Sequence, residues 1–540
     1  MRPSAHTREI ELAFGLDEPD DEQAMRHRAA RELRVSPEEL GPLLPLKRSI
    51  DARRGRVVFR WVVSVGGVRG PLGEPLPKEG LGSPSVLIVG DGPAGLFCAY
   101  QLARRGIAAR VLDRGKAVQP RRHDLAALNK AGVVDGDSNY CFGEGGAGTY
   151  SDGKLYTRAH KRGPVRDVIE TLALHGAPDT ILTDARPHIG SNKLPRVISG
   201  MRDRLASAGV VFEFGARVVD LIVQGRAERK IAGVRLADGT EHFAEHVVLA
   251  TGHSARDVFD LLVKYDVPLL PKGFALGVRI EHPQALVNQM QYGRFASHPR
   301  LPNAAYRVVQ PVGEGSDERG VFSFCMCPGG WIVPASTEQG ALVVNGMSLS
   351  RRDSPFANSG LVVAIEPLDW ERAGFTGPLG GVDLQRTVEE AAWKAGGGGL
   401  VAPATRASDF LAKRGSSTVP ETSYLPGLNA GDVREVLAAS RLGLASKLAQ
   451  ALKVFEERMP GYAGSDAVMV ATESRTSAPL QVIRHPERFD SPTLSGLYPC
   501  GEGAGWAGGI VSAALDGLRV ADAIAEQVGA TPSVSRESTS

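Results

Sequence analysis

The sequence is poor in cysteine, with five cysteines in 540 residues. So few cysteines cannot supply a disulfide framework, which favours a reducing, cytoplasmic location. Long hydrophobic runs are also missing. No apolar stretch reaches the roughly 18 residues of a membrane-spanning helix, so no transmembrane segment is expected. The first nine residues lack an apolar signal core, so a secretory signal is not expected either.

An excess of charge of one sign is absent as well, because 63 Lys and Arg residues face 61 Asp and Glu residues. A net charge of +2 gives no general support for binding to nucleic acid or to a membrane surface. One segment departs from this balance, since residues 47–69 carry seven basic residues and one acid, Asp51. This patch is interpreted as a solvated or docking face rather than an RNA or phosphate site.

Glycine is abundant, with 64 residues, and three glycines form the most informative motif. An apolar run over residues 86–89 predicts a buried strand, and Gly90, Gly92 and Gly95 follow it at G-x-G-x-x-G spacing. The first glycine permits a tight turn, the second lets a pyrophosphate approach the backbone, and the third allows close packing of a helix. That helix would begin near Pro93 and Ala94 and offer its free N–H groups to phosphates. The motif predicts dinucleotide binding.

Further pieces of the same site lie far along the chain. A second strand over residues 109–112 ends in Asp113, followed by Arg114, where a contact to a ribose hydroxyl is expected. A return strand ends at Thr251-Gly252. A last strand and glycine loop contain Gly501 and Glu502, about 400 residues after the first motif. Because an NAD domain is usually compact, this distance favours FAD.

Several motifs in order extend this pattern across most of the chain. They are the segments 48–53, 142–155, 188–194, 324–330, 345–348, 473–476 and 500–505, together with the glycine motif at 90–95. With them the chain resembles a bacterial group usually described as uncharacterized FAD-dependent dehydrogenases. That group is placed among the two-domain FAD flavoproteins of the glutathione-reductase-like superfamily.

The resemblance implies FAD as cofactor and assigns contacts to it. Gly90, Gly92 and Gly95 would face the pyrophosphate, Asp113 the adenosine ribose, and Glu502 the ribityl or pyrophosphate. The sequence has Asp113 where Glu is more common and Glu502 where Asp is more common. The other residues implied at the cofactor are Pro93, Ala94, Arg114, Gly145, Gly146, Thr251, Gly252, Gly501, Gly508, Gly509 and Ile510. Of these, the amides of residues 508–510 would face the N1/O2 edge of the flavin.

The expected fold is α/β, with a Rossmann-like FAD-binding domain that is discontinuous in sequence and an inserted β-rich, α+β substrate domain. The expected parts are an N-terminal α/β module (1–80), the first part of the FAD domain (85–254), the substrate domain (255–480), the closing part (481–527) and a disordered tail (528–540). A capping box at Ser36 predicts a helix start. Residues 210–214, 218–223 and 231–236 are interpreted as a β-meander, and residues 434–458 as helical.

Four residues are candidates for catalysis, and each has a plainer alternative. Lys154 could hold an anionic substrate or stabilise reduced flavin, or it could lie on a solvated strand face. His253 could be a general base, although contact with cofactor backbone is favoured. Glu473 and Arg475 could face the substrate or form an internal ion pair.

Cys325 and Cys327 form a C-x-C pair, which is poor geometry for a disulfide. The favoured interpretation is therefore two small buried residues beside the active-site cleft. A metal site would need another ligand at a sensible spacing, and none is found, so no metal is predicted.

The predicted function is an FAD-dependent oxidoreductase of the dehydrogenase or oxidase type, acting on a small organic metabolite by hydride transfer. No second G-x-G-x-x-G unit follows a strand, so NAD(P)H would visit transiently or O2 would reoxidise the flavin. The alternatives are a flavin monooxygenase, an FAD-dependent RNA-modifying enzyme supported only by the 47–69 patch, and a non-catalytic flavin-binding scaffold.

Overall fold

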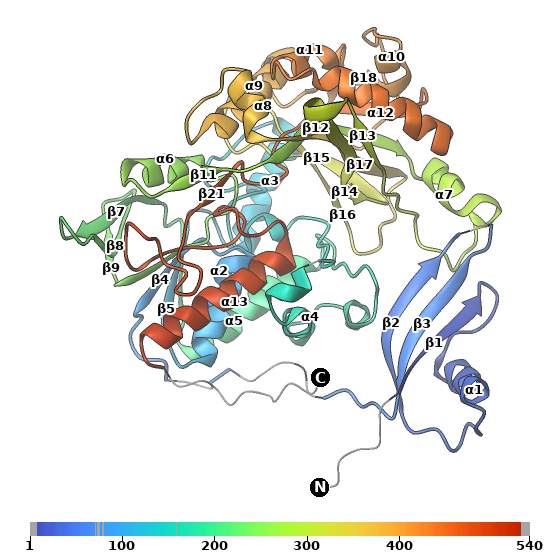
Figure 1. Cartoon of the computed structure of the whole chain (residues 1–540), viewed down its shortest axis with the longest axis horizontal. Helices are drawn as coiled ribbons and strands as arrows, with labels where there is room; N and C mark the ends of the chain where they lie inside the picture. The colour runs from blue at the N-terminus through green and yellow to red at the C-terminus, as the bar shows by residue number, and fades with distance from the viewer. Residues whose placement is uncertain are drawn as a thin grey trace.

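The computed structural model describes residues 8–530 except 54, 71, 73–75, 78, 79 and 158. The expected tail at 528–540 therefore falls outside the described residues from 531 onward. Three regions are evident in Figure 1: an N-terminal sheet, a parallel sheet with its helices, and a large mixed sheet covered by helices. None of the described helices is both long enough and apolar enough to cross a membrane.

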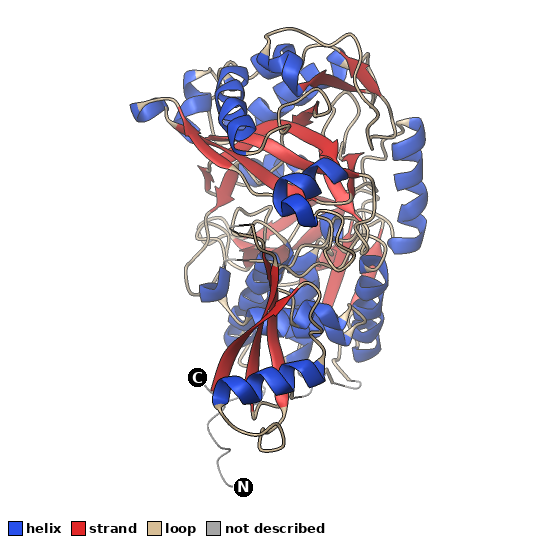
Figure 2. Cartoon of the chain, turned by 90° about the vertical axis from the view of Figure 1, so that its right-hand side faces the viewer, coloured by secondary structure: helices blue, strands red, loops and turns tan. Residues whose placement is uncertain are grey.

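The N-terminal region is a three-stranded antiparallel sheet with one helix across its face (Figure 2). Its elements are β1 (Arg8–Gly15), α1 (Glu22–Leu33), β2 (Leu43–Asp51) and β3 (Val58–Val65), with β3 in the centre. Phe14 and Phe59 are buried against Met25 of the helix. The helix predicted from the capping box at Ser36 is wrong. Glu39 does accept a hydrogen bond from the Ser36 amide (2.8 Å), but Gly41 and Pro42 follow at once and residues 36–39 form a single turn.

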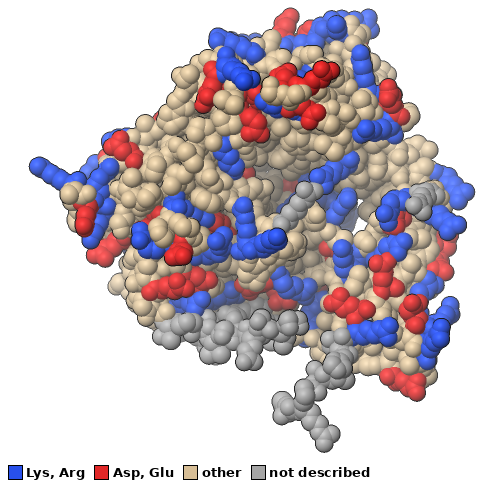
Figure 3. Space-filling model, in the orientation of Figure 1, with Lys and Arg blue, Asp and Glu red and all other residues tan. Residues whose placement is uncertain are grey.

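Three of the seven basic residues of segment 47–69 form ion pairs within this region. Arg53 pairs with Asp51 at 2.7 Å and Arg48 pairs with Asp20 at 3.5 Å, while Arg60 pairs with Glu11. On the face shown in Figure 3, Lys and Arg side chains are interspersed with Asp and Glu. The charges of Arg48, Arg53 and Arg60 are therefore balanced in part by local carboxylates.

Five parallel strands form the second sheet, in the order β22-β10-β4-β5-β6. They are β4 (Val86–Val89), β5 (Ala109–Asp113), β6 (Val211–Phe214), β10 (His246–Leu249) and β22 (Leu497–Pro499). The predicted α/β class with a Rossmann-like sheet is confirmed. The assignment of residues 210–214 to a meander is wrong, because α5 (Leu194–Ala208) returns the chain first and β6 then pairs in parallel with β5.

Both faces of the parallel sheet are buried, which explains the continuous apolar sequence of its strands. Val86 and Ile88 pack against α2 (Pro93–Arg104), α5 and α13 (Ile510–Gln527). α4 (Val165–Leu174) joins this cluster. α3 (Val118–Ala131) lies beside the loop that follows α3 in the chain. Leu87 and Val89 point to the opposite face, as the two-residue period of a strand requires.

That opposite face is covered by an antiparallel sheet and a helix. They are β7 (Val218–Gln224), β8 (Lys230–Leu236), β9 (Glu241–Phe243) and α6 (Arg256–Lys264). A short pair, β11 (Leu269–Pro271) with β21 (Leu480–Val482), links this part to the large mixed sheet. The two strands lie about 200 residues apart in sequence. They pair where the chain leaves the parallel-sheet region and later returns to it.

The mixed sheet has seven strands in the order β13-β14-β17-β12-β20-β18-β19. They are β12 (Phe274–Pro283), β13 (Val309–Val312), β14 (Arg319–Cys327), β17 (Phe356–Ile365), β18 (Ala402–Arg406), β19 (Leu428–Ala430) and β20 (Val468–Glu473). A hairpin of β15 (Gly330–Pro334) and β16 (Val344–Ser348) lies on its inner side. This hairpin and β14 face the parallel sheet across the central part of the molecule.

Helices cover the outer side of the mixed sheet. They are α7 (Gln284–Tyr292), α8 (Pro367–Arg372), α9 (Gly380–Ala395), α10 (Ala407–Leu411), α11 (Val433–Ala438) and α12 (Leu444–Arg458). The single helix expected over 434–458 is therefore two helices. Arg441 and Gly443 both have positive φ (60° and 63°), which a continuous right-handed helix does not permit.

Candidate functional site

The turn after β4 has the geometry that its glycines predict. Gly90 has φ of 101°, and a Cβ there would lie 2.5 Å from the Ala250 carbonyl oxygen. A Cβ on Gly95 would lie 1.9 Å from the Gly90 carbonyl oxygen, so α2 can pack this closely only on glycine. At Gly92 the nearest atom to an added Cβ is 3.9 Å away, on Gly146. Gly92 therefore leaves open space above the turn.

That space is a cavity of about 500 Å³ at the carboxyl ends of β4, β5 and β10, bordered by the first residues of α2 and α13. It has the size of a small-molecule or cofactor site. Most of the residues predicted for the cofactor line it: Gly90, Gly92, Pro93, Ala94, Asp113, Arg114, Gly146, Thr251, Gly252, Glu502, Gly508, Gly509 and Ile510. Three catalytic candidates also line it, namely Lys154, His253 and Arg475.

Four predicted site residues do not line this cavity. Gly95 packs under the turn, as described above. Gly145 has φ of 75°, and a Cβ there would meet the Thr149 hydroxyl. Gly501 lies against Ala94 of α2. Glu473 lines a smaller cavity of about 50 Å³, which shares several lining residues with the larger one, including His253 and Arg475.

Asp113 is a structural anchor of the turn as well as part of the cavity wall. Its two carboxylate oxygens accept hydrogen bonds from the backbone N–H groups of Asp91 (2.9 Å) and Gly115 (2.8 Å). A carboxylate oxygen has a second lone pair, so each oxygen can still accept a donor from the cavity.

Asp91, at a variable position of the glycine motif, is an unexpected feature. Its side chain is fully buried, and within the described residues neither of its oxygens has a hydrogen-bond partner. Burial, and then the charges of Asp113 and Glu144, raise the pKa of Asp91 well above its ordinary value. Burial beneath the turn therefore disfavours the ionised form of this side chain. The glycine motif could not predict this buried carboxyl group, because its second position accepts many residue types.

His253 and Arg475 are joined, and both belong to a buried network. The His253 Nε2 donates to the Arg475 carbonyl oxygen at 2.9 Å. The Arg475 guanidinium forms two hydrogen bonds with Glu389, at 3.0 and 2.8 Å, and a third with Thr337 at 2.7 Å. Arg475 was expected either to face the substrate or to form an internal ion pair. Its guanidinium group forms an internal ion pair, with Glu389. His253 keeps Nδ1 as the acceptor of its ring, since Nε2 carries the donated proton.

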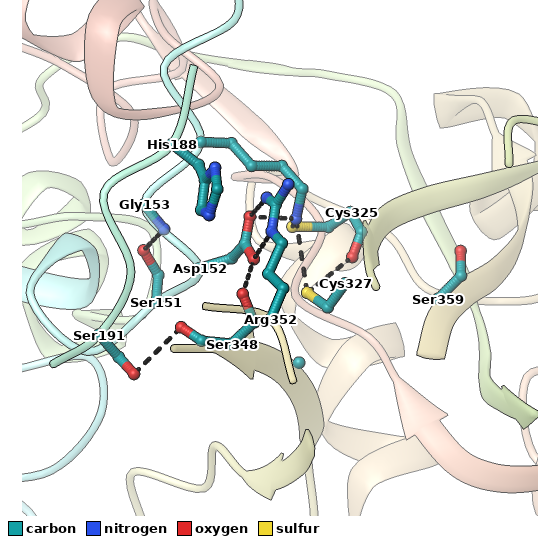
Figure 4. A network of polar contacts seen from close by, with 12 residues as sticks. Ser151, Asp152, Gly153, His188, Ser191, Cys325, Cys327, Ser348, Arg352 and Ser359 are labelled. Atoms are coloured by element: carbon teal, nitrogen blue, oxygen red, sulfur yellow. Dashed lines mark hydrogen bonds and ion pairs between the residues drawn. The ribbon is translucent and has the colours of Figure 1, made fainter. Parts of the chain in front are cut away.

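Lys154 contacts Asp152, Cys325 and Cys327, three residues that lie together in Figure 4. Its Nζ is 3.0 Å from the Asp152 carboxylate and within 3.6 Å of both Cys325 Sγ and Cys327 Sγ. Although burial favours the neutral amine, Asp152 and the two thiols raise the pKa of Lys154 above its ordinary value. Lys154 is therefore a cation fixed by its ion pair with Asp152, rather than a side chain on a solvated strand face.

The cavity suits a long dinucleotide with two phosphates. The N-termini of α2 and α13, both long helices, border it and present backbone N–H groups without side-chain caps. Added Cβ atoms at Gly508 and Gly509 would meet nothing within 4 Å, so the backbone there is open to the cavity. These features fit the flavin adenine dinucleotide that the sequence predicts.

Comparisons with known proteins support this assignment. Residues 273–476 match the family model "FAD-dependent protein, C-terminal domain-like", and residues 193–322 match "FAD dependent oxidoreductase". An uncharacterized protein of Clostridium beijerinckii is 37% identical over 542 residues, which cover 95% of this chain and 98% of that protein. The chain belongs to the FAD-dependent oxidoreductases. FAD is its cofactor, and the N-terminal residues 6–66 of this flavoenzyme match a separate domain of unknown function.

Solved structures show more distant likeness to the flavoenzyme. The flavin-dependent brominase Bmp2 is 14% identical, with a TM-score of 0.37 over 83% of this chain and 80% of its own. A flavoprotein/dehydrogenase from Cytophaga hutchinsonii is 10% identical, with a TM-score of 0.36 over the same shares. Glycine oxidase from Bacillus cereus is 12% identical, with a TM-score of 0.31 over 82% of this chain and 98% of its own. Similarity at this level transfers no residue's role.

Proposed function

We propose that FAD occupies the 500 Å³ cavity and that the enzyme transfers a hydride between a small organic metabolite and the flavin. The observation that carries this proposal is the composition of the cavity wall. Its lining includes the glycine turn of the parallel sheet, suited to phosphates, and also Lys154, Cys325 and Asn345 near the mixed sheet. One continuous space thus combines a dinucleotide cradle with polar groups suited to a substrate.

The residues of the cavity have separate roles in this proposal. Bound FAD supplies hydride chemistry. Gly90 and Gly92 leave room for its pyrophosphate, and the backbone amides at the start of α13 would stabilise negative charge on a bound flavin. Burial raises the pKa of Glu502, which favours the protonated form that would donate a hydrogen bond to bound FAD. His253 presents Nδ1 as a proton acceptor near the substrate.

The remaining features of the proposal concern relatives, partners and location. The closing of the parallel sheet by β22 and α13 supports placement in the glutathione-reductase-like superfamily. NAD(P)H or O2 is the proposed co-substrate, and the ion pairs of Arg48, Arg53 and Arg60 in segment 47–69 support a function without nucleic acid. All five cysteines are unpaired in the structure, which supports a reducing, cytoplasmic compartment.

The position of FAD is tested by filling the space above Gly92. Gly92 has φ of −73°, which any residue adopts, and its added Cβ meets little protein. We expect Gly92→Val to fold normally but to lose at least about tenfold in FAD affinity, because the side chain occupies the path of the pyrophosphate. Gly399→Val is the control, since Gly399 also faces open space but lies outside the cavity. Equal FAD content and affinity in the two variants would contradict the placement.

The reaction type is tested by anaerobic reduction of the purified flavoenzyme. NADH, NADPH and panels of amino, hydroxy and other small organic donors are added in turn, and the flavin absorbance is followed. Bleaching by an organic donor, with reoxidation by O2, supports the dehydrogenase or oxidase assignment. Bleaching by nicotinamide alone, with oxygen inserted into an added substrate, would favour the monooxygenase instead.

A further inference from the structure

Two cysteines stand at the end of β14, where that strand leaves its regular pairing. The register with β17 shifts between Phe324 and Cys327, so one extra residue bulges out of the ladder. Cys325 occupies the bulge with φ of 46°, a conformation that non-glycine residues seldom adopt. The bulge places Cys325 on the wall of the flavin cavity, and it is the one exposed cysteine of the chain. Cys327 is fully buried behind it.

The bulge brings both sulfur atoms to the same cation. Lys154 Nζ lies 3.6 Å from Cys325 Sγ and 3.4 Å from Cys327 Sγ. Lys154 belongs to the loop that carries Asp152, and Figure 4 shows Asp152 close to the two cysteines, which come from a different part of the chain. Asp152 fixes the lysine at 3.0 Å and is itself held by Arg352 at 2.5 Å and by Ser348. The position of the ammonium group is therefore set by a buried ion network.

A second cation, Arg279, lies beside the two cysteines. Arg279 is fully buried, lies 3.6 Å from Cys327 Sγ, and donates to the Cys325 carbonyl oxygen at 2.8 Å. Its charge is balanced by Glu473 at 2.7 Å. The arginine thus fixes the backbone of the bulge and adds positive charge beside the sulfur atoms.

These surroundings favour a thiolate at the exposed cysteine. A hydrogen bond from Cys327, and then the charges of Lys154 and Arg279, lower the pKa of Cys325 well below its ordinary value, although burial and Asp152 oppose this. The same pairing, together with burial, raises the pKa of Cys327. The surroundings therefore favour the thiolate at Cys325, which faces the cavity, and the protonated thiol at Cys327 behind it.

We propose that Cys325 and Cys327 are a redox-active thiol pair that exchanges two electrons with the flavin, Cys325 acting as the exposed nucleophile and Cys327 as the resolving thiol. The inference rests on the proposed flavin site, because the cavity that Cys325 lines is the one assigned to FAD. The sequence favoured a purely structural role for both residues, since C-x-C spacing in a regular strand is poor for a disulfide. The bulge removes that regular geometry.

The chemistry of the step balances without a further reactant. The Cys325 thiolate and the Cys327 thiol form an S–S bond, and the S–H bond of Cys327 breaks. The pair delivers two electrons and that one proton to oxidised FAD. The negative charge passes from the Cys325 sulfur to the reduced cofactor. The reverse step reduces the disulfide and restores the thiolate beside Lys154.

The other cysteines provide internal controls. Cys98 and Cys500 are fully buried, and burial raises the pKa of each thiol, so neither is expected to react. Cys141 also lines the flavin cavity, and its sulfur accepts a hydrogen bond from the Ser254 hydroxyl at 3.4 Å. Among the described residues no lysine hydrogen-bonds to Cys141, so Cys141 is matched to Cys325 in location but lacks a contact with a lysine ammonium group.

The first test measures thiolate character by alkylation of the purified flavoenzyme with iodoacetamide at pH 6, with the modified peptides quantified by mass spectrometry. We expect Cys325 to react at least about tenfold faster than Cys141. Lys154→Met should slow Cys325 markedly, and Lys154→Arg should restore much of the rate because it keeps the charge. Equal rates at Cys325 and Cys141 would overturn the proposal.

The second test follows disulfide formation and its coupling to the flavin. Mild oxidation with diamide should yield a Cys325–Cys327 disulfide, seen by differential labelling, in the wild type and in Cys141→Ser. Anaerobic dithiothreitol should then bleach the flavin faster in both of these proteins than in Cys325→Ser or Cys327→Ser. Absence of the disulfide, or equal bleaching in all four proteins, would overturn the proposal. Protein without bound flavin would count against the flavin site, while the alkylation and labelling results would still judge the thiol pair.

Discussion

At the scale of single residues, two buried carboxylates differ in their partners and therefore in their effect on stability. Glu389 is fully buried between Arg475 at 2.8 Å and Arg256 at 2.9 Å. Burial opposes its ionisation, but the two guanidinium groups lower the pKa of Glu389 to about 2. A lowered carboxyl pKa stabilises the folded state above the ordinary glutamate value, and this stabilisation is lost as pH falls toward 2.

Glu389→Gln should therefore lower the unfolding free energy at pH 7 by about 3–5 kcal/mol, because it leaves two buried arginines without their counter-charge. The loss should shrink between pH 4 and pH 2, where the wild-type carboxylate is itself protonated. Thermal unfolding midpoints across this range give the measurement. Glu338→Gln is the control, since Glu338 pairs with Arg256 at 2.7 Å but is 42% exposed, and should cost about 0–1 kcal/mol. Equal losses in the two variants would contradict this account.

Glu281 shows the opposite behaviour because its partners are neutral. Its carboxylate accepts from the Ser423 amide at 2.7 Å and from the Ser423 hydroxyl, and burial raises its pKa to about 7. The folded state then prefers the protonated acid, so this residue makes the protein less stable as pH rises from about 4.3 to 7. Glu281→Gln should remove that part of the pH dependence and raise the melting temperature at pH 8 relative to wild type. If the change in melting temperature between pH 5 and pH 8 is the same in Glu281→Gln as in wild type, the prediction is refuted.

At the scale of elements, the packing of α2 on β4 depends on a single missing side chain. Gly95→Ala places a Cβ 1.9 Å from the Gly90 carbonyl oxygen, which is backbone and cannot yield without moving the helix or the turn. We expect a loss of at least about 1–3 kcal/mol in unfolding free energy even without FAD. Gly92→Ala is the matched variant in the same motif and should keep the stability of the FAD-free protein. Unfolding of both FAD-free variants, followed by thermal denaturation, provides the comparison.

The elements also show how far the sequence could predict the structure. The segment 86–104 could be predicted because a strand, a glycine turn and a helix are set by neighbouring residues. The pairing of β6 with β5 could not be predicted, because the sequence of residues 211–214 does not indicate which strand lies beside them. The thiol cluster was likewise hidden. Lys154 and Cys325 lie 171 residues apart, and only the bulge at the end of β14 brings them together.

At the scale of the whole molecule, polar contacts dock the N-terminal sheet, and Tyr292, Phe295 and Leu301 pack against its apolar core. Arg300 donates to the Leu16 carbonyl oxygen at 2.6 Å and to Asp20 at 2.5 Å, and its guanidinium lies 4.9 Å from the centre of the Phe59 ring. Arg48 adds a backbone contact, donating its N–H to the Thr183 carbonyl oxygen at 2.7 Å. None of the residues that line the flavin cavity comes from β1–β3 or α1.

Arg300→Ala should therefore loosen the N-terminal sheet without emptying the flavin site. We expect amide hydrogen exchange in β1 and β3 to accelerate by about tenfold or more, because the docking contacts contribute to the stability of this sheet. The FAD content and flavin spectrum should stay at wild-type values, since the cavity is built elsewhere. Arg294→Ala is the control, because Arg294 belongs to the same connecting segment but is exposed, with its guanidinium 4.8 Å from the centre of the Phe295 ring. Loss of FAD in Arg300→Ala, with retention in Arg294→Ala, would show instead that docking of the N-terminal sheet shapes the flavin site.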